Sequence, residues 1–133
     1  MSPQLQVPRL EEIARVAAAT PGVQVLTLYG SRARGDEHGT SDWDLGYLGD
    51  PGLDHGGLLL ALIDVLDTDA VDLVDLRRAS GLLRFRAAQD GRAIFEREPG
   101  SMDQFRLDAA GFWCDAAPVL EPALESVLAE LRR

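Results

Sequence analysis

Lysine is absent from this chain of 133 residues, so all 13 of its basic residues are arginine. Because the chain also has 22 acidic residues, its formal net charge is −9. Nucleic-acid phosphates attract surfaces rich in Lys and Arg, so this charge argues against a polymerase that extends DNA or RNA. We therefore expect no direct binding of nucleic acid, although arginine remains well suited to bidentate contacts with individual phosphate groups.

Cysteine is almost as scarce, since Cys114 is the single one. A single cysteine excludes an internal disulfide and fits a reducing, cytoplasmic setting. The two histidines, His38 and His55, have no second ligand at a spacing typical of zinc sites. The longest apolar run, at 58–63, is far too short to cross a bilayer, and the N-terminus lacks a basic-then-apolar signal pattern. We expect a cytoplasmic protein that does not associate with membranes.

Apolar periodicity and turn residues divide the chain into helices and strands. Strands are expected where β-branched and apolar residues are enriched, and helices where apolar residues recur every three or four positions. In chain order these patterns predict a helix at 8–19, strands at 23–29 and 42–48, a buried helix at 58–66, a strand at 70–76, a helix at 80–90 capped by Ser80, a strand at 92–96, and tail helices at 102–117 and 118–131.

This order predicts one α/β (α+β) domain with a mixed, mainly antiparallel sheet of about four strands. We expect the helices to cover one face of the sheet, with acidic residues on the other face or at one edge. The break at Glu98-Pro99-Gly100 divides a core at 1–100 from a helical tail at 101–133, which belongs to the same domain.

The pair Gly30-Ser31 follows the first predicted strand. A turn at this point exposes backbone N–H groups, and glycine lets a phosphate approach the main chain closely. The hydroxyl of Ser31 adds a donor to the same phosphate. Two arginines follow, and one of them can reach the β- or γ-phosphate; a plain surface position is an equal alternative for Arg32 and a weaker one for Arg34. Taken alone, a Gly-Ser pair is more typical of an ordinary turn.

Asp42 and Asp44 begin the second predicted strand, ten residues after the Gly-Ser pair. Alternate side chains of a strand share one face, which places the two carboxylates side by side with Cα atoms roughly 6–7 Å apart. Such a pair repels itself unless a cation compensates, and Mg²⁺ prefers hard oxygen ligands shared with substrate phosphates. Two ions about 3.5–4 Å apart stabilise both the attacking and the leaving oxygen of an in-line displacement.

The third predicted strand supplies a further carboxylate. Asp72 and Asp75 both interrupt apolar surroundings, and their spacing of three sends them to opposite faces of a strand. We choose Asp72 because it lies in mid-strand, whereas Asp75 lies near Arg77 and Arg78, where a surface ion pair is expected. Arg84 and Arg86 are expected on the solvated face of the helix at 80–90, without a role in the site.

These residues together resemble the minimal nucleotidyltransferase (MNT) family of the DNA polymerase β-like superfamily. Its pattern is Gly-Ser, ten residues, Asp-x-Asp, and a later strand with another Asp. Gly30, Ser31, Asp42 and Asp44 match without a gap, and the strand around Asp72 is similar to the third-carboxylate strand. The resemblance covers residues 23–95 and implies a nucleotidyltransferase fold.

The resemblance also implies an activity and a partner. Many members are antitoxins paired with a HEPN-domain RNase toxin, and they transfer AMP from ATP to a tyrosine of that toxin. In this interpretation Gly30, Ser31 and Arg34 bind the nucleotide, while Asp42, Asp44 and Asp72 bind two Mg²⁺ ions and carry the catalysis.

Two alternatives stay open on the sequence alone. A small-molecule nucleotidyltransferase of the aminoglycoside type would use the same chemistry, and an acidic chain suits a cationic drug. An antitoxin that neutralises its toxin by binding alone would need no catalysis. The sequence also leaves open the acceptor, the nucleotide preference and whether the protein forms homo- or hetero-oligomers.

Overall fold

The computed structural model describes residues 3–34 and 42–111, so Cys114, His38 and the predicted helix at 118–131 lie outside the described residues. The elements are, in chain order, α1 (Pro3–Ala19), β1 (Val23–Tyr29), α2 (Gly30–Arg34), β2 (Trp43–Gly49), α3 (His55–Leu66), β3 (Val71–Asp75), α4 (Gly81–Asp90) and β4 (Arg92–Glu96). Residues 101–111 form a further helix, the described part of the first predicted tail helix.

The strands form one sheet in the order β3-β2-β1-β4. β1 runs antiparallel to both β2 and β4, while β2 and β3 are parallel and are connected across the sheet by α3. The predicted class, a mixed and mainly antiparallel sheet of four strands with helices, is therefore confirmed. This topology brings the carboxyl end of β1 and the amino ends of β2 and β3 to the same end of the sheet.

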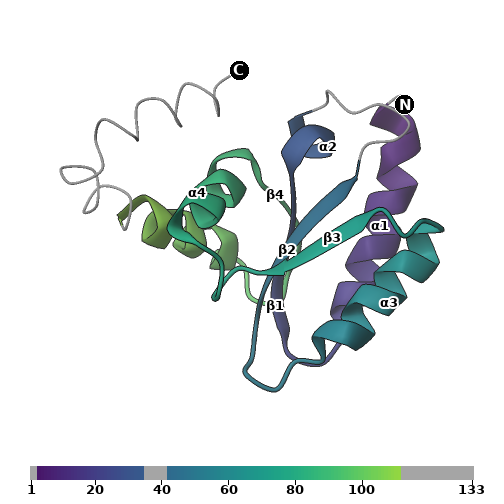
Figure 1. The fold of residues 1–133 in the computed structure, drawn as a ribbon, viewed down its shortest axis with the longest axis horizontal. Helices are drawn as coiled ribbons and strands as arrows, with labels where there is room; N and C mark the ends of the chain where they lie inside the picture. Colours follow the sequence, from purple (N-terminus) through teal and green to yellow (C-terminus); the bar gives the residue numbers. More distant parts are fainter. Residues whose placement is uncertain (1–2, 35–41, 112–133) are drawn as a thin grey trace.

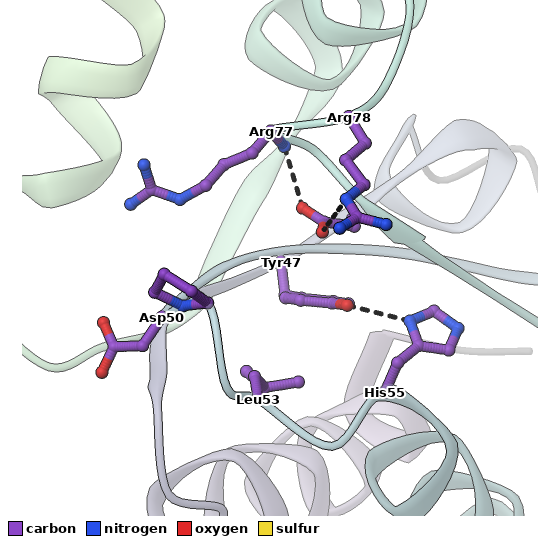
Figure 2. Close-up of a pocket in the computed structure, with 9 residues that line it drawn as sticks. Tyr47, Asp50, Leu53, His55, Arg77 and Arg78 are labelled. Atoms are coloured by element: carbon purple, nitrogen blue, oxygen red, sulfur yellow. Dashed lines mark hydrogen bonds and ion pairs between the residues drawn. The ribbon is translucent and has the colours of Figure 1, made fainter.

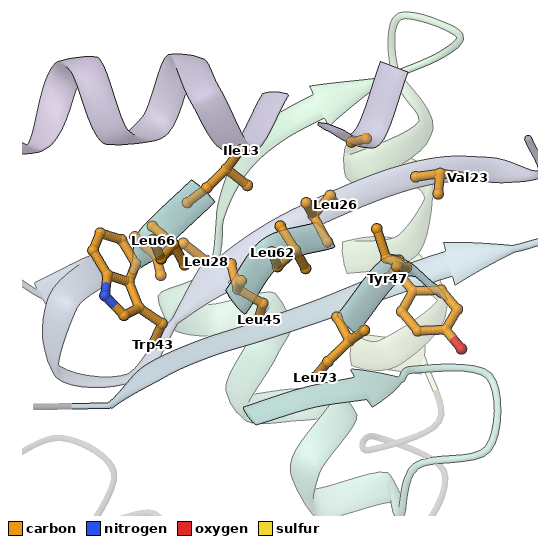
Figure 3. Packing of buried hydrophobic residues seen from close by; sticks show 12 residues of the cluster. Ile13, Val23, Leu26, Leu28, Trp43, Leu45, Tyr47, Leu62, Leu66 and Leu73 are labelled. Carbon is orange, nitrogen blue, oxygen red and sulfur yellow. The ribbon is translucent and has the colours of Figure 1, made fainter. Parts of the chain in front are cut away.

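One face of the sheet packs against α1 and α3 and forms the larger part of the core (Figures 1 and 3). Leucines of α3 and the apolar face of α1 meet alternate residues of the central strands, whose other residues point away. The side chains that fill this layer include Ile13, Leu26, Leu28, Trp43, Leu45, Tyr47, Leu62, Leu66 and Leu73.

The opposite face is also covered, which corrects the expectation of helices on one face only. There α4 and the helix at 101–111 pack on a second apolar cluster of Val25, Tyr29, Leu76, Ala87, Met102 and Phe105, and Figure 1 shows helices on both sides of the sheet. The physical reason lies in β1, where residues of both alternating sets are apolar and buried. A strand of that kind needs cover on both faces.

Helix boundaries follow local capping chemistry. Asp54 caps α3 by accepting a hydrogen bond from the backbone N–H of Gly57, so α3 begins three residues before the predicted helix. Ser80 caps α4 as predicted, through a bond from the N–H of Leu83 to its hydroxyl. Within the described residues, no helix combines the length and apolar character needed to cross a membrane.

Candidate active site

Gly30 forms the turn between β1 and α2. It is buried and has a φ of +75°, in the left-handed region that glycine adopts without strain. A Cβ added at this position would collide with the carboxylate oxygen Oδ2 of Asp44 and lie 3.1 Å from its Cγ. The backbone of the Gly-Ser turn and the second carboxylate of the Asp-x-Asp motif are therefore in direct contact.

Asp44 and Asp72 lie side by side on neighbouring strands. In the sheet register Asp44 is the Cα partner of Tyr29 on β1 and of Asp72 on β3. Trp43 and Leu45 point into the layer of α1 and α3, so Asp44 points to the face of the sheet that α4 covers. Parallel strands are about 4.8 Å apart, so two carboxylates in this arrangement reach a common ligand easily. Asp44 is half-buried and Asp72 is exposed.

Asp42 is exposed and precedes β2 by one residue, whereas the sequence predicted a strand that starts at Asp42 itself. Sheet pairing begins at Trp43, whose N–H donates to the carbonyl of Ala70. Strand alternation therefore does not fix the direction of the Asp42 side chain. Among residues 3–34 and 42–111, no group of three or more His, Cys, Asp or Glu side chains is arranged to hold a metal ion. The role of Asp42 as a metal ligand stays a prediction.

The donor set nevertheless fits Mg²⁺. Its members are carboxylate oxygens, the ligands that this ion prefers, and they lie at a solvent-accessible end of the sheet. The carboxylate of Asp44 lies in the space that a side chain at position 30 would fill, so glycine lets this carboxylate lie directly against the main chain of the Gly-Ser turn. Mg²⁺ there would be held by Asp42, Asp44 and Asp72 and would neutralise the negative charge of a bound triphosphate.

Tyr29 is a site neighbour that the sequence reasoning missed. It is 5% exposed at the end of β1, and burial, followed by the charges of Asp72 and Asp44, raises its pKa from 10.0 to about 12, while Arg86 acts in the opposite direction. Both carboxylates and one guanidinium therefore act electrostatically on a single phenol. No sequence motif indicates it, because Tyr29 looks like any apolar residue of a buried strand.

This environment predicts a pH-dependent stability. Because the folded protein holds the Tyr29 proton more tightly, the stabilisation is complete below pH 10 and is lost as the pH rises through about 12. Tyr29→Phe should remove part of this loss. Urea midpoints measured at pH 9, 10 and 11 should fall less steeply in the variant than in the wild type. If the urea midpoints of the two proteins fell equally steeply with pH, the pKa of the Tyr29 phenol would be the same in the folded and the unfolded state, and the prediction would be wrong.

The other predicted nucleotide-binding residues are only partly described. Gly30, Ser31 and Arg34 all lie in α2, but the side chains of Ser31 and Arg34 are outside the described residues. Arg32 is buried, and its guanidinium carbon lies 4.2 Å from the centroid of the Trp43 ring. Trp43 belongs to the layer of α1 and α3, so Arg32 contacts the sheet face opposite to Asp44 and anchors α2 there.

Asp75 lies away from this site, as the choice of Asp72 requires. It is the Cα partner of Tyr47, lies 3.9 Å from Arg78 and accepts a hydrogen bond from the N–H of Arg77, so the expected surface ion pair is present. These residues line a hollow of about 640 Å³ at the carboxyl ends of β2 and β3, where Tyr47 is hydrogen-bonded to His55 (Figure 2).

That hollow is a poor candidate for the nucleotide. None of the predicted site residues whose side chains the structure describes lines it, and Asp50 and Asp75 balance the charges of its two arginines. It lies at the end of the strands opposite to Gly30, because Tyr47 and Gly49 close β2 at that end. The hollow and the carboxylate site are therefore separate features.

Comparison with known proteins identifies the family. The family model described as "Polymerase beta, Nucleotidyltransferase" matches residues 11–100, well over half of the chain. The chain belongs to this nucleotidyltransferase family. The match extends from α1 past β4, so it contains every strand and every candidate carboxylate of the nucleotidyltransferase. The resemblance inferred from the motifs is thereby confirmed.

Several known nucleotidyltransferases are similar over most of their length. "Protein adenylyltransferase MntA" of Aphanizomenon flos-aquae (strain 2012/KM1/D3) is 28% identical over 125 residues, which cover 77% of this chain and 79% of that protein. A crystal structure of a toxin–antitoxin with AMP-PNP has a chain with a TM-score of 0.75 and 26% identity, over 90% of this chain and 98% of that one.

A further similar structure contains a tri-AMPylated HEPN toxin of Shewanella oneidensis in complex with an MNT antitoxin. Its matching chain has a TM-score of 0.71 and 24% identity, over 92% of this chain and 98% of that chain. At that identity the similarity shows the fold alone. The overall fold of this chain is therefore similar to that of the matching chain in this complex.

Proposed function

We propose that this chain is a Mg²⁺-dependent protein adenylyltransferase that acts as an antitoxin, transferring AMP from ATP to a tyrosine of a HEPN-domain RNase toxin. The observation that carries the proposal is the contact of Gly30 with Asp44, with Asp72 in register beside it. The similarity to the adenylyltransferase and to the toxin–antitoxin with AMP-PNP supports the nucleotide and the partner. A cytoplasmic reaction fits the ATP and Mg²⁺ it needs.

In the proposed reaction, the Gly30-Ser31 turn and Arg34 hold the triphosphate of ATP. Asp42, Asp44 and Asp72 would hold two Mg²⁺ ions, which would supply charge neutralisation at the reacting phosphate. The tyrosine oxygen of the toxin forms a bond to the α-phosphorus, and the bond from that phosphorus to the bridging oxygen breaks. Its electron pair leaves on pyrophosphate, and Asp72 accepts the proton of the tyrosine hydroxyl. Positioning and charge neutralisation supply most of the acceleration.

The proposal is tested by incubating the protein with its partner toxin, MgCl₂ and ATP labelled on the α-phosphate. We expect the label to appear on the toxin, with release of pyrophosphate, and peptide mass spectrometry should locate AMP on a tyrosine. Label on the γ-phosphate should not reach the toxin, and EDTA should stop the reaction. A folded protein that binds the toxin but leaves it unlabelled would contradict catalysis and favour neutralisation by binding alone.

A further inference from the structure

The guanidinium of Arg86 is incompletely hydrogen-bonded in the described part of the protein. It lies in the middle of α4 and is half-buried, and its Nε is buried without a hydrogen-bond partner. Two other half-buried arginines have carbonyl partners: Arg9 donates to the carbonyl of Val65 at 2.9 Å, and Arg106 donates to that of Gly91 at 2.8 Å. A buried donor without a partner is costly, so this position demands an explanation.

The course of α4 brings Arg86 toward the carboxylate end of the sheet. The helix begins after the carboxyl end of β3 and ends just before β4, where Arg92 is the Cα partner of Leu28. It therefore runs back up the sheet toward the end that carries Gly30, and it packs against both β1 and α2 (Figure 1). Ala87, its neighbour in sequence, belongs to the same apolar cluster as Tyr29.

The charges that act on Tyr29 agree with this course of α4. Its positive charge lowers the pKa of Tyr29, the same phenol whose pKa is raised by Asp72 and Asp44. Tyr29 is the Cα partner of Asp44 and the residue before Gly30. The guanidinium and the two carboxylates thus all act on one side chain at the end of β1, on the face of the sheet that α4 covers.

A bound triphosphate would supply the missing acceptors. The Gly30-Ser31 turn offers only neutral donors, Arg32 is engaged with the Trp43 ring on the opposite face, and the chain has no lysine, so Arg86 would join Arg34 as a charged donor to the phosphates. A charged, planar fork of N–H donors is the group that best matches phosphate oxygens. The sequence assigned Arg86 to a solvated helix face, and its half-buried position corrects that assignment.

We propose that Arg86 of α4 donates hydrogen bonds to the β- or γ-phosphate oxygens of bound ATP and so neutralises the charge that departs as pyrophosphate. The inference rests on the proposed function, since it deepens the same site. Arg86 makes no bond to the transferred AMP in this scheme. Its loss should therefore weaken binding of triphosphates and leave binding of AMP unchanged.

The test compares Arg86→Gln and Arg86→Lys with the matched control Arg84→Gln. Arg84 lies on the same helix, with its guanidinium carbon 5.7 Å from the Phe105 ring centroid. Titration with AMP-PNP and MgCl₂ should show roughly tenfold weaker binding for Arg86→Gln, with partial recovery in Arg86→Lys and no change in Arg84→Gln. The affinity for AMP should be the same in all four proteins, including the wild type.

Thermal unfolding separates this role from a structural one. Removing a half-buried, unpaired donor should leave the melting temperature of Arg86→Gln unchanged or higher, whereas a structural arginine would lower it. Wild-type affinity for AMP-PNP in a folded Arg86→Gln variant overturns the inference and leaves the proposed function intact. Failure of the wild type to bind AMP-PNP with Mg²⁺ refutes both.

Discussion

Asp44→Asn is expected to reduce AMP transfer by roughly a thousandfold or more, because a carboxylate that holds the catalytic cation contributes several kcal/mol to the transition state. Asparagine matches the shape of aspartate, so the packing against Gly30 is retained while the charge is lost. The initial rate of AMP incorporation into the toxin, at saturating ATP and MgCl₂, measures the effect. Asp72→Asn, on the adjacent strand and in register, should cause a loss of similar size.

Asp75→Asn is the matched control for this prediction. It removes a carboxylate from the same strand as Asp72, but from the side paired with Tyr47 and Arg78. Its transfer rate should stay within about threefold of the wild type, since an exposed ion pair contributes little. Equal losses in Asp72→Asn and Asp75→Asn would show that the assignment of the third carboxylate is wrong. A melting temperature for Asp44→Asn at or above that of the wild type, without Mg²⁺, would show that the fold survives.

Local patterns in the sequence were enough to predict the strands that carry the site. Residues 92–96 form a strand as predicted, and 23–29 form β1 with the expected bounds. The alternation of side chains along a strand also distinguished the two candidate aspartates. Asp72 must lie on the same face of the sheet as Val74, and Asp75 must lie on the opposite face. The register in the structure agrees: Asp72 pairs with Asp44 at one end of the sheet and Asp75 with Tyr47 toward the other.

Features that depend on contacts between distant segments could not be predicted in this way. Residues of both alternating sets in β1 are apolar, but the sequence does not say which helices cover each face. All helices were expected on one face of the sheet, whereas α4 covers the face opposite to α1 and α3. The partial burial of Arg86 depends on how α4 packs on β1 and α2. The contact of Arg32 with Trp43 joins residues on either side of positions 35–41, so no spacing rule indicates it.

Gly30→Ala is expected to impair both stability and activity. Its φ of +75° costs an alanine about 1–2 kcal/mol, which a urea denaturation curve would measure. The new methyl group would also collide with Oδ2 of Asp44 and push the carboxylate away from its position. Since a displacement of about 1 Å in a reacting group can cost a hundredfold in rate, we expect at least that loss per folded molecule.

Gly22→Ala distinguishes the two contributions. Gly22 has a φ of +92°, but a Cβ there would lie 3.5 Å from Leu53, an ordinary contact, and far along β1 from the carboxylates. Both variants should therefore lose the stability that depends on the positive φ, with a further loss in Gly30→Ala from the collision with Asp44, while only Gly30→Ala loses transfer activity when the rates are normalised to folded protein. If both variants retain wild-type rates, the contact between the Gly-Ser turn and Asp44 does not matter for catalysis. A loss confined to Gly30→Ala would show that glycine is needed there to leave space for the carboxylate, beyond its freedom to adopt a positive φ.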